Sequence, residues 1–416
     1  MAFERPRGVR DFGPGEMSKR VCVEDILYDV FSSFGYKKIG TPTFEFLELF
    51  EQKSGADIRD HLYVFEDKGG RKLCLRPEMT ASVARSYASD LRTLPKPLRL
   101  SYYGPMFRYE EPQKGRYREF WQAGVELFGV SGPEADAEAI LVASECLQRL
   151  GLKYRLRISN IGVLRRLLEL QGLGVGGQDR LIQLLDKRGL DAVKEEVQDK
   201  ALRDLLGLKG SSEVVGEAIR NVSDSEAKRL LTGLKDTLSL LDVVSVPYEV
   251  DFSMARGLDY YTGMVFDVKV EGLGAQNQVC GGGRYDTLVE AFAGPSTPAV
   301  GFAFGVDRLV EALDEQGVDV HVKKPDVFVL AVSDAVRADA FRIACDIRRA
   351  RPELTVEIDL AGRRLNKALQ HASESGAKYS VIVGEKELEE GSVGLKDMSS
   401  KEQKTVDTDE LPLALG

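Results

Sequence analysis

The chain has 416 residues, with 57 basic and 66 acidic side chains and a formal net charge of −9. A hydrophobic content of 43% with 30% charged residues is typical of a chain that buries substantial cores, and the length suggests more than one domain. Collagen-like, disordered and strongly basic DNA-coating classes are excluded. The sequence has neither an apolar run long enough to cross a bilayer nor the apolar stretch of a signal peptide at its start. We therefore expect no membrane partner and a cytoplasmic location.

The cysteine and histidine positions argue against structural metal or disulfide sites. The five cysteines are scattered and never form a C-x-x-C pair, and the three histidines lie far apart without zinc-ligand spacing. Free, buried thiols are the expected state of the cysteines. Neither a zinc site nor a Ser-His-Asp triad is expected.

The first half of the chain predicts a helix and a long hairpin. Apolar residues at helical spacing predict an amphipathic helix over 21–34, which ends at Gly35 and leads into an extended segment, 36–42. The segment 98–128, interrupted by a polar stretch at 110–115, predicts an antiparallel hairpin. Period-2 alternation on its returning strand predicts an apolar face (Trp121, Ala123, Val125, Leu127) and a polar face (Phe120, Gln122, Gly124, Glu126).

The second half predicts a helical insertion and a separate small domain. Residues 164–245 are rich in Leu, Lys, Glu and Asp and predict helices. Strands are then expected at 248–252 and 264–270, and the glycines at 281–283 are expected to precede a helix beginning near Asp286. The last region alternates between expected strands (327–332, 355–360, 379–383) and helices (334–350, 363–375), which predicts a small α/β domain.

Three arginines indicate an anionic ligand, although the usual nucleotide signatures are missing. The chain has no G-x-x-x-x-G-K-[ST] loop, and the glycines at 281–283 do not form G-x-G-x-x-G. Arg108, Arg256 and Arg308 each lie in an apolar or glycine-containing stretch, where a guanidinium needs a partner such as phosphate. The alternatives are a solvated sheet face for Arg108 and an ion pair with an acid such as Asp259 for Arg256.

Longer strings carry a resemblance to a known family. FRYEEPQKGRYREF at 107–120 resembles motif 2 of class II aminoacyl-tRNA synthetases, 301–309 resembles motif 3, and the segment ending at Pro42 resembles motif 1. RGLDYYTG at 256–263 and GGGRYD at 281–286 are similar to signatures of the histidyl-tRNA synthetase family. The resemblance covers nearly the whole chain except the insertion.

The resemblance implies a fold, a reaction and partners. It implies an α/β chain: a class II catalytic domain with an antiparallel sheet flanked by helices (1–163 and 246–320), a helical insertion (164–245) and an anticodon-binding domain (323–416). Histidine and ATP would give histidyl-adenylate and pyrophosphate, and the histidyl group would pass to its tRNA. ATP with Mg²⁺, L-histidine, that tRNA and a second copy in a homodimer are the implied partners, with no DNA; no metal ligand set can be identified.

The resemblance also implies residue roles in two halves of one site. For ATP, Arg108 and Arg256 would contact the α-phosphate, Arg308 the γ-phosphate side, and Phe120 and Glu110 the adenine ring. For histidine, the matching positions are a loop (Glu78, Met79, Thr80), the polar hairpin face (Gln122, Glu126), Arg256 and two tyrosines (Tyr260, Tyr261). Core packing is the alternative for the tyrosines.

The expected tRNA contacts lie in two places. In the motif 2 loop the candidates are Gln113 and Lys114, for which a solvated turn is an equally good interpretation. Glu111 and Trp121 depart from the family pattern, where Arg and His are common, and weaken inference about that loop. In the terminal domain, Arg363, Arg364 and Lys367 form a local basic patch, with a solvated helix face as the alternative.

Two other functions compete with this interpretation. A non-catalytic regulatory subunit of ATP phosphoribosyltransferase would share the catalytic-domain fold, but such proteins usually lose the RGLDYYTG string and the anticodon domain, and both are present here. A class II synthetase for another amino acid, such as proline or threonine, would carry different pocket strings. An intact RGLDYYTG string favours histidine over both.

Overall fold

The computed structural model describes residues 3–54, 56–111, 116–194, 196–197, 199–255, 260–274, 277–320 and 323–415. The chain forms two compact units, residues 1–321 and 322–416. Each has a hydrophobic core of its own. Among the described residues, no helix combines the length and the apolar character needed to cross a bilayer.

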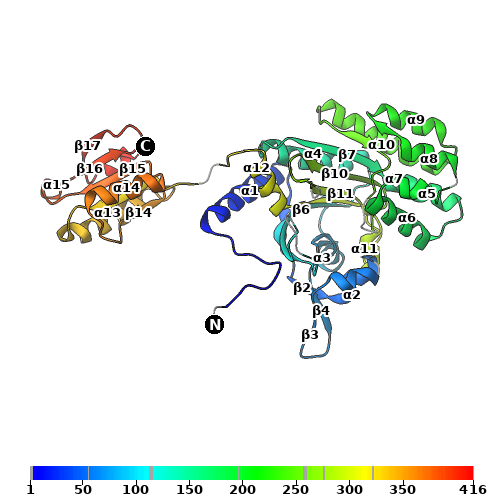
Figure 1. Ribbon diagram of the computed structural model, residues 1–416, viewed down its shortest axis with the longest axis horizontal. Helices are drawn as coiled ribbons and strands as arrows, with labels where there is room; N and C mark the ends of the chain where they lie inside the picture. The colour runs from blue at the N-terminus through cyan, green and yellow to red at the C-terminus, as the bar shows by residue number, and fades with distance from the viewer. Residues whose placement is uncertain are drawn as a thin grey trace. The chain divides into compact units, whose positions relative to one another are not determined.

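A nine-stranded sheet organises the first unit (Figure 1). Its pairs are antiparallel except β1·β5 and β7·β9. The strands, in spatial order, are β1 (Lys37–Lys38), β5 (Leu98–Phe107), β6 (Glu119–Phe128), β12 (Ala299–Gly305), β11 (Gln278–Arg284), β10 (Met264–Val270), β7 (Tyr154–Asn160), β9 (Glu249–Asp251) and β8 (Lys209–Gly210). This mixed, mainly antiparallel sheet with flanking helices confirms the expected fold class.

The helices that pack on this sheet include α1 (Pro14–Ser33), α4 (Pro133–Arg149) and α12 (Val306–Glu315). The predicted helix at 21–34 is present but begins at Pro14, because proline suits the first helical position, where no N–H is needed. Its buried face includes Val23, Leu27 and Phe31. These side chains and the sheet belong to one continuous core.

The predicted hairpin is β5 and β6. Leu98 pairs with Phe128 and Phe107 with Glu119. The apolar face is buried as predicted at Ala123, Val125 and Leu127, whereas Trp121 is only partly buried. On the other face Glu126 is also fully buried, so this face lines the interior of the unit near Glu126.

A smaller three-stranded sheet lies beside the hairpin. It contains β2 (Phe44–Phe46), β4 (Lys72–Leu75) and β3 (Val64–Glu66), and α2 (Leu47–Ser54), η1 (Ala56–His61), α3 (Thr80–Ser86) and the helical turn η2 (Tyr87–Leu91) accompany it. Backbone bonds attach it to the hairpin, since Phe107 N donates to Arg76 O at 2.9 Å. The loop between β4 and α3 is thereby placed next to the end of β5.

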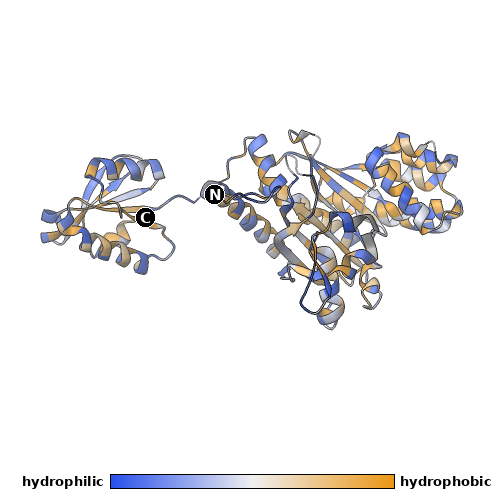
Figure 2. Cartoon of the chain, turned by 60° about the horizontal axis from the view of Figure 1, so that its bottom comes forward, coloured by the Kyte–Doolittle hydropathy of each residue, from blue (hydrophilic) through white to orange (hydrophobic). Residues whose placement is uncertain are grey.

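The insertion is helical as predicted. Its helices are α5 (Ile161–Leu170), α6 (Val175–Arg188), α7 (Leu190–Lys194), α8 (Lys200–Gly207), α9 (Glu213–Asn221) and α10 (Ser225–Val243). Asp199 and Asp224 cap α8 and α10 by accepting from the N–H groups of Leu202 and Ala227. Figure 2 shows hydrophobic and hydrophilic residues mixed along these helices, as expected for amphipathic helices packed on one another. The short strand β8 between α8 and α9 was not predicted.

The glycines at 281–283 lie inside strand β11, not in a loop before a helix. The following helix, α11 (Leu288–Ala291), is short and begins two residues after Asp286. The glycines are needed because the strands pack closely here: a Cβ at Gly282 would lie 2.5 Å from the carbonyl oxygen of Gly301.

The second unit is a five-stranded α/β domain. Its strands, in spatial order, are β14 (Val356–Ile358), β13 (Val327–Ala331), β15 (Tyr379–Val383), β16 (Ser392–Asp397) and β17 (Gln403–Asp407). The helical segments are η4 (Asp334–Val336), α13 (Arg337–Ala350), α14 (Leu365–Ser375), α15 (Glu385–Glu389) and α16 (Leu411–Ala414). The three predicted strands and two predicted helices are present. Strands β16 and β17 were missed.

Candidate active site

A cavity of about 560 Å³ opens on the central strands of the first unit. Nine of the predicted site residues line it: Glu78, Thr80, Arg108, Glu110, Phe120, Gln122, Tyr260, Tyr261 and Arg308. Met79 and Glu126 are buried near them. Arg256, Gln113 and Lys114 lie outside the described residues, and Arg363, Arg364 and Lys367 belong to the second unit.

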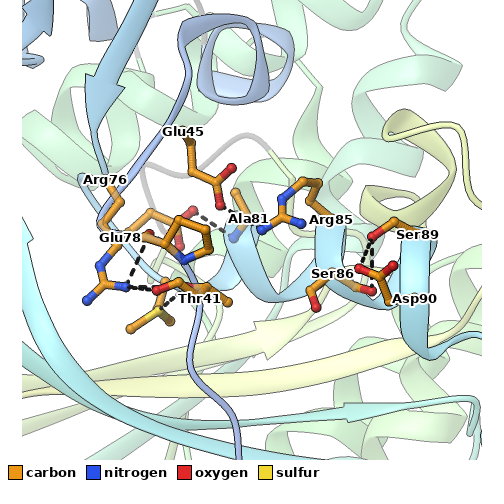
Figure 3. Close-up of polar contacts among 11 residues, drawn as sticks. Thr41, Glu45, Arg76, Glu78, Ala81, Arg85, Ser86, Ser89 and Asp90 are labelled. Atoms are coloured by element: carbon orange, nitrogen blue, oxygen red, sulfur yellow. Dashed lines mark hydrogen bonds and ion pairs between the residues drawn. The ribbon is translucent and has the colours of Figure 1, made fainter.

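Glu78 is fixed where the β4–α3 loop enters α3 (Figure 3). Thr80 N and Ala81 N donate to its two carboxylate oxygens at 2.7 and 2.9 Å. Burial raises the pKa of Glu78, and these backbone N–H groups partly counteract the effect. Arg76 anchors the loop by donating to Thr41 O and Pro105 O. The result is a half-buried carboxylate in the cavity wall that a ligand cation would stabilise.

Glu126 is a fully buried acid near Glu78. Thr80 Oγ1 donates to its Oε1 at 2.6 Å, Tyr102 OH donates to the same atom at 3.3 Å, and Tyr285 OH donates to Oε2. Burial raises its pKa to about 8, against the effect of the hydroxyl donors, and the nearby charge of Glu78 adds to the rise. Glu78 in the cavity wall and Glu126 buried near it give this end of the cavity an acidic character suited to a cationic group.

Aromatic rings and an amide border these acids. The rings of Tyr260 and Tyr261 lie 4.9 Å apart, and Tyr260 lies 5.8 Å from Tyr285, edge to face. Gln122 Oε1 is buried and has no hydrogen-bond partner among the described residues. An unpaired buried acceptor is costly, so this oxygen fits a ligand that donates an N–H or O–H.

The cationic end of the cavity begins directly beside the loop that carries Glu78. Arg108 Nε donates to Pro77 O at 2.9 Å, and its guanidinium lies 5.0 Å from the centre of the Phe120 ring. Arg308 Nη1 donates to Gln278 O at 2.7 Å. Burial lowers the pKa of Arg308, and the charges of Arg116 and Arg108 lower it further. Guanidinium groups that repel one another in this way favour a polyanionic ligand.

Glu110 lies among these arginines. Burial alone would raise its pKa, but the hydrogen bond from Arg116 and the charge of Arg108 hold the pKa below its usual value. Glu110 is therefore an ionised acceptor at the edge of the cationic end. Such an acceptor can receive an amino group of a ligand.

Glycines leave room for the buried groups. Gly301 pairs with Glu126 in the β12–β6 ladder, and a Cβ at Gly301 would lie 1.9 Å from Glu126 Oε2. At Gly124, a Cβ would lie 2.6 Å from Tyr102 OH. The Glu126 carboxylate and its tyrosine donors thus occupy space that only glycine leaves free.

Several lining residues were missed from the sequence. Tyr285, although inside the GGGRYD string, was not assigned to the site; the others include Arg116, Tyr117 and, from helix α6 of the insertion, Asp186 and Lys187. Tyr102 supports Glu126 from β5. Alternation could have placed Tyr102 on the Glu126 side of the hairpin, but no local pattern brings α6 to the cavity.

Two family models together match most of the chain. The model "Histidyl-tRNA synthetase" matches residues 8–309, and the model "Anticodon binding domain" matches residues 326–415. The chain belongs to the histidyl-tRNA synthetase family. The resemblance found in the sequence is thereby confirmed.

Individual relatives are similar to this chain over nearly all of its length. Histidine--tRNA ligase from Archaeoglobus fulgidus is 43% identical, and the match covers 99% of both chains. The crystal structure of histidyl-tRNA synthetase from Nostoc sp. PCC 7120 has a TM-score of 0.82 at 25% identity, covering 100% of this chain and 99% of that one. A structure from Bacillus halodurans, described as an ATP phosphoribosyltransferase regulatory subunit/histidyl-tRNA synthetase, has a TM-score of 0.78 at 28% identity, covering 92% of this chain and 99% of that one.

The two departures from the family pattern have structural partners. Glu111 forms an exposed ion pair with Arg7 at 2.9 Å. Trp121 N donates to Asp307 Oδ2 at 2.8 Å, and its ring packs 5.1 Å from that of Tyr103. Neither side chain lines the cavity.

The anticodon-binding unit has a cavity of about 400 Å³ beside the predicted basic patch, lined by Phe328, Arg348, Leu360, Arg363 and His371, among others. Arg363 is paired with Asp359 at 2.5 Å. Arg364 and Lys367 are exposed at the start of α14. Exposed cations next to a partly apolar cavity suit a ligand with phosphates and bases.

Proposed function

We propose that this chain activates L-histidine with ATP and transfers the histidyl group to the 3′ end of its tRNA. The observation that carries the proposal is the combination of both family models with one cavity that has a buried acidic end and a cationic end. A zwitterionic amino acid and a triphosphate have complementary charges. Their reacting groups would meet between the two ends.

The chemistry follows from this division. A carboxylate oxygen of histidine attacks the α-phosphorus of ATP, a new O–P bond forms, and the bond to pyrophosphate breaks. A hydroxyl of the terminal adenosine then attacks the activated carbonyl carbon, and AMP leaves. Negative charge builds on the phosphoryl oxygens in the first step, so Arg108 and Arg256 would stabilise it and Arg308 would hold the leaving pyrophosphate side. Phe120 would stack on adenine and Glu110 would accept from its amino group.

The acidic end would select histidine. Glu78 and the Thr80 hydroxyl would receive the ammonium group, with Met79 packing behind the loop. Gln122, Glu126, Tyr260 and Tyr261 would surround the imidazole, whose two nitrogens need one partner each. A smaller or apolar side chain would leave those buried polar groups unpaired, which is the basis of strong discrimination.

Magnesium would come with the nucleotide. Among the described residues, no group of three or more His, Cys, Asp or Glu side chains is placed to hold a metal ion. In the cavity, Glu110 forms an ion pair with Arg116, and Asp307 forms ion pairs with two arginines. Because these carboxylates already pair with arginine side chains, Mg²⁺ would be held mainly by phosphate oxygens and water.

The tRNA would contact both units. Arg363, Arg364 and Lys367 would contribute on the anticodon side, and Gln113 and Lys114 near the acceptor end. We also propose a homodimer formed through the segment that resembles motif 1, a cytoplasmic location, which the five free thiols support, and the domain boundaries 1–163, 164–245, 246–320 and 323–416.

The test is amino-acid-dependent exchange of labelled pyrophosphate into ATP. Exchange with histidine and with none of the other amino acids is the expected result. Exchange with a different amino acid would keep the reaction class and overturn the pocket assignment. No exchange from folded protein would favour the function of a regulatory subunit, which is one of the two descriptions given to the similar Bacillus halodurans protein.

A further inference from the structure

The N-terminal segment, residues 5–12, packs against the hairpin that carries the cationic end of the site. Arg118 N donates to Gly8 O at 2.8 Å, and Arg7 pairs with Glu111. The Arg10 guanidinium lies 4.4 Å from the centre of the Tyr117 ring. This segment is almost 300 residues away in sequence from α12, to which it also binds.

The link to α12 is the carboxylate of Asp307. Arg10 Nη2 and Arg20 Nη1 both donate to its Oδ1, at 3.1 and 2.8 Å. Asp307 is 3% exposed and Arg20 is 2% exposed. Arg10 also pairs with Glu16 at 2.9 Å. The buried guanidinium of Arg20 and the half-buried guanidinium of Arg10 thus share one buried carboxylate, and removing either cation leaves that charge less well compensated.

The aromatic surroundings fix both arginines. Arg20 lies 4.1 Å from the Phe12 ring and Arg10 lies 4.6 Å from the same ring. Arg10 Nε and Arg20 Nη2 are buried and have no hydrogen-bond partner among the described residues. Contact with the ring faces offsets part of this cost. The planar guanidinium groups of Arg10 and Arg20 therefore make these ring contacts, and the ammonium group of a lysine would not reproduce them.

Asp307 continues the β12–β6 ladder where the strand ends. The last backbone pair is Gly305 with Gln122. Beyond it, Asp307 Oδ2 accepts from Trp121 N, which would otherwise have lost its partner. One carboxylate thus fixes the residue next to Phe120 and lies next to Arg308 in its own helix. Both neighbours line the cationic end of the cavity.

We infer that Arg10 is a positioning residue for ATP, acting through Asp307 and Tyr117 on Phe120 and Arg308. In the described part of the chain, the partners of Arg10 are two acids and two aromatic rings, none of them at the acidic end. That end is held by different groups: Glu126 by Thr80, Tyr102 and Tyr285, and Glu78 by the first turn of α3. The inference rests on the proposed assignment of the cationic end to ATP.

The experiment is pyrophosphate exchange with the full chain, varying ATP and histidine separately. Arg10→Ala should raise KM for ATP by about five- to tenfold, because small displacements of positioning groups are costly, and should change KM for histidine by less than about twofold. Arg10→Lys should fall between, since it keeps a cation but not the planar contacts. Arg5→Ala is the matched control, because Arg5 is exposed and pairs only loosely with Asp11, at 3.5 Å; it should leave both KM values unchanged.

The outcomes separate the proposed function from the role of Arg10. Wild-type protein without histidine-dependent exchange would overturn the proposed function itself. An active wild type with unchanged ATP KM in Arg10→Ala, or with equal changes in both KM values, would overturn only the role of Arg10. A lower kcat with both KM values unchanged would mean a smaller folded fraction, a structural role that also contradicts the inference; thermal melting of each variant measures that fraction directly.

Discussion

Glu126 links the stability of the empty protein to pH. Its pKa is raised from near 4.5 to about 8 by burial, so between these values the folded protein keeps a proton that the unfolded chain has released. The free energy of unfolding contributed by this group therefore falls as pH rises through that window. Glu126→Gln has no such group. We expect the stability of Glu126→Gln relative to wild type to rise between pH 5 and pH 8.

Urea unfolding of substrate-free protein at several pH values measures this difference. The comparison between the two proteins cancels the other titrating groups. Parallel pH profiles would contradict the burial argument. A lowered pKa of the Glu126 carboxyl, as expected if the three hydroxyl donors outweighed burial, would also give parallel profiles between pH 5 and pH 8 and would change the difference only below pH 4.5.

Gly301 tests the space around the same carboxylate. Gly301→Ala would place a Cβ 1.9 Å from Glu126 Oε2 and 2.4 Å from the carbonyl oxygen of Val125, so both the carboxylate and the neighbouring strand β6 must shift. We expect KM for histidine to rise about tenfold or more, with a smaller change in KM for ATP. Gly233→Ala is the control, because a Cβ in the middle of α10 meets nothing within 4 Å and should stabilise the helix by ~1 kcal/mol. Equal effects of the two substitutions on KM would contradict the prediction.

Individual site residues were predictable where one element determines them. Gln122 and Glu126 lie on one strand, so the period of two placed them together. Tyr285 joins Glu126 only through the register of three strands, β11, β12 and β6, which no local pattern specifies. The sequence alone also could not show that Arg10 and Arg20 share Asp307, because ion pairs between distant segments produce no periodic pattern in the sequence.

At the scale of elements, Arg284 joins the two family signatures. Arg284 donates to Asp136 of α4 and to Asp286, while Thr262 N donates to Arg284 O and Asp286 N to Thr262 Oγ1. The GGGRYD string is thus attached to the end of the RGLDYYTG string and to a flanking helix. The neighbouring residue, Tyr285, points to Glu126.

We expect the loss of Arg284 alone to destabilise the protein more than the loss of Arg284 and Asp136 together. Arg284→Met alone leaves Asp136 buried without its cation and should destabilise the protein by ~3–5 kcal/mol. The double variant Arg284→Met, Asp136→Leu should recover a large part of that loss, since the buried charge is gone. Denaturant unfolding measures both; a double variant less stable than Arg284→Met would contradict the prediction.

Elements with a strong pattern were predicted and weak ones were not. The hairpin and the insertion helices have clear periodicity. Strand β17 is almost wholly exposed and polar, so it shows no alternation, and it exists because it pairs with β16 at the sheet edge. β8 has only two residues and forms because β9 offers a free edge.

At the scale of the whole molecule, we expect the two units to carry separable tasks. Each has its own core, with Val23, Phe266 and Leu309 in the first and Val329, Ile343 and Val381 in the second. A chain ending at residue 321 should therefore keep histidine-dependent pyrophosphate exchange within about threefold of wild type, and lose at least about tenfold in tRNA charging. Equal losses in both assays would show that the units depend on each other for folding or activation.

The floor of the cavity includes residues of three interior strands of a nine-stranded sheet, and this has a consequence for local opening. Residues of β6, β11 and β12 have ladder partners on both sides, unlike those of the edge strands β1 and β8. Their amide protons can meet solvent only when the whole unit unfolds. In native-state hydrogen exchange, the slowest amides of the chain should therefore surround the substrate cavity, whereas many enzymes place their chemistry on their most mobile loops.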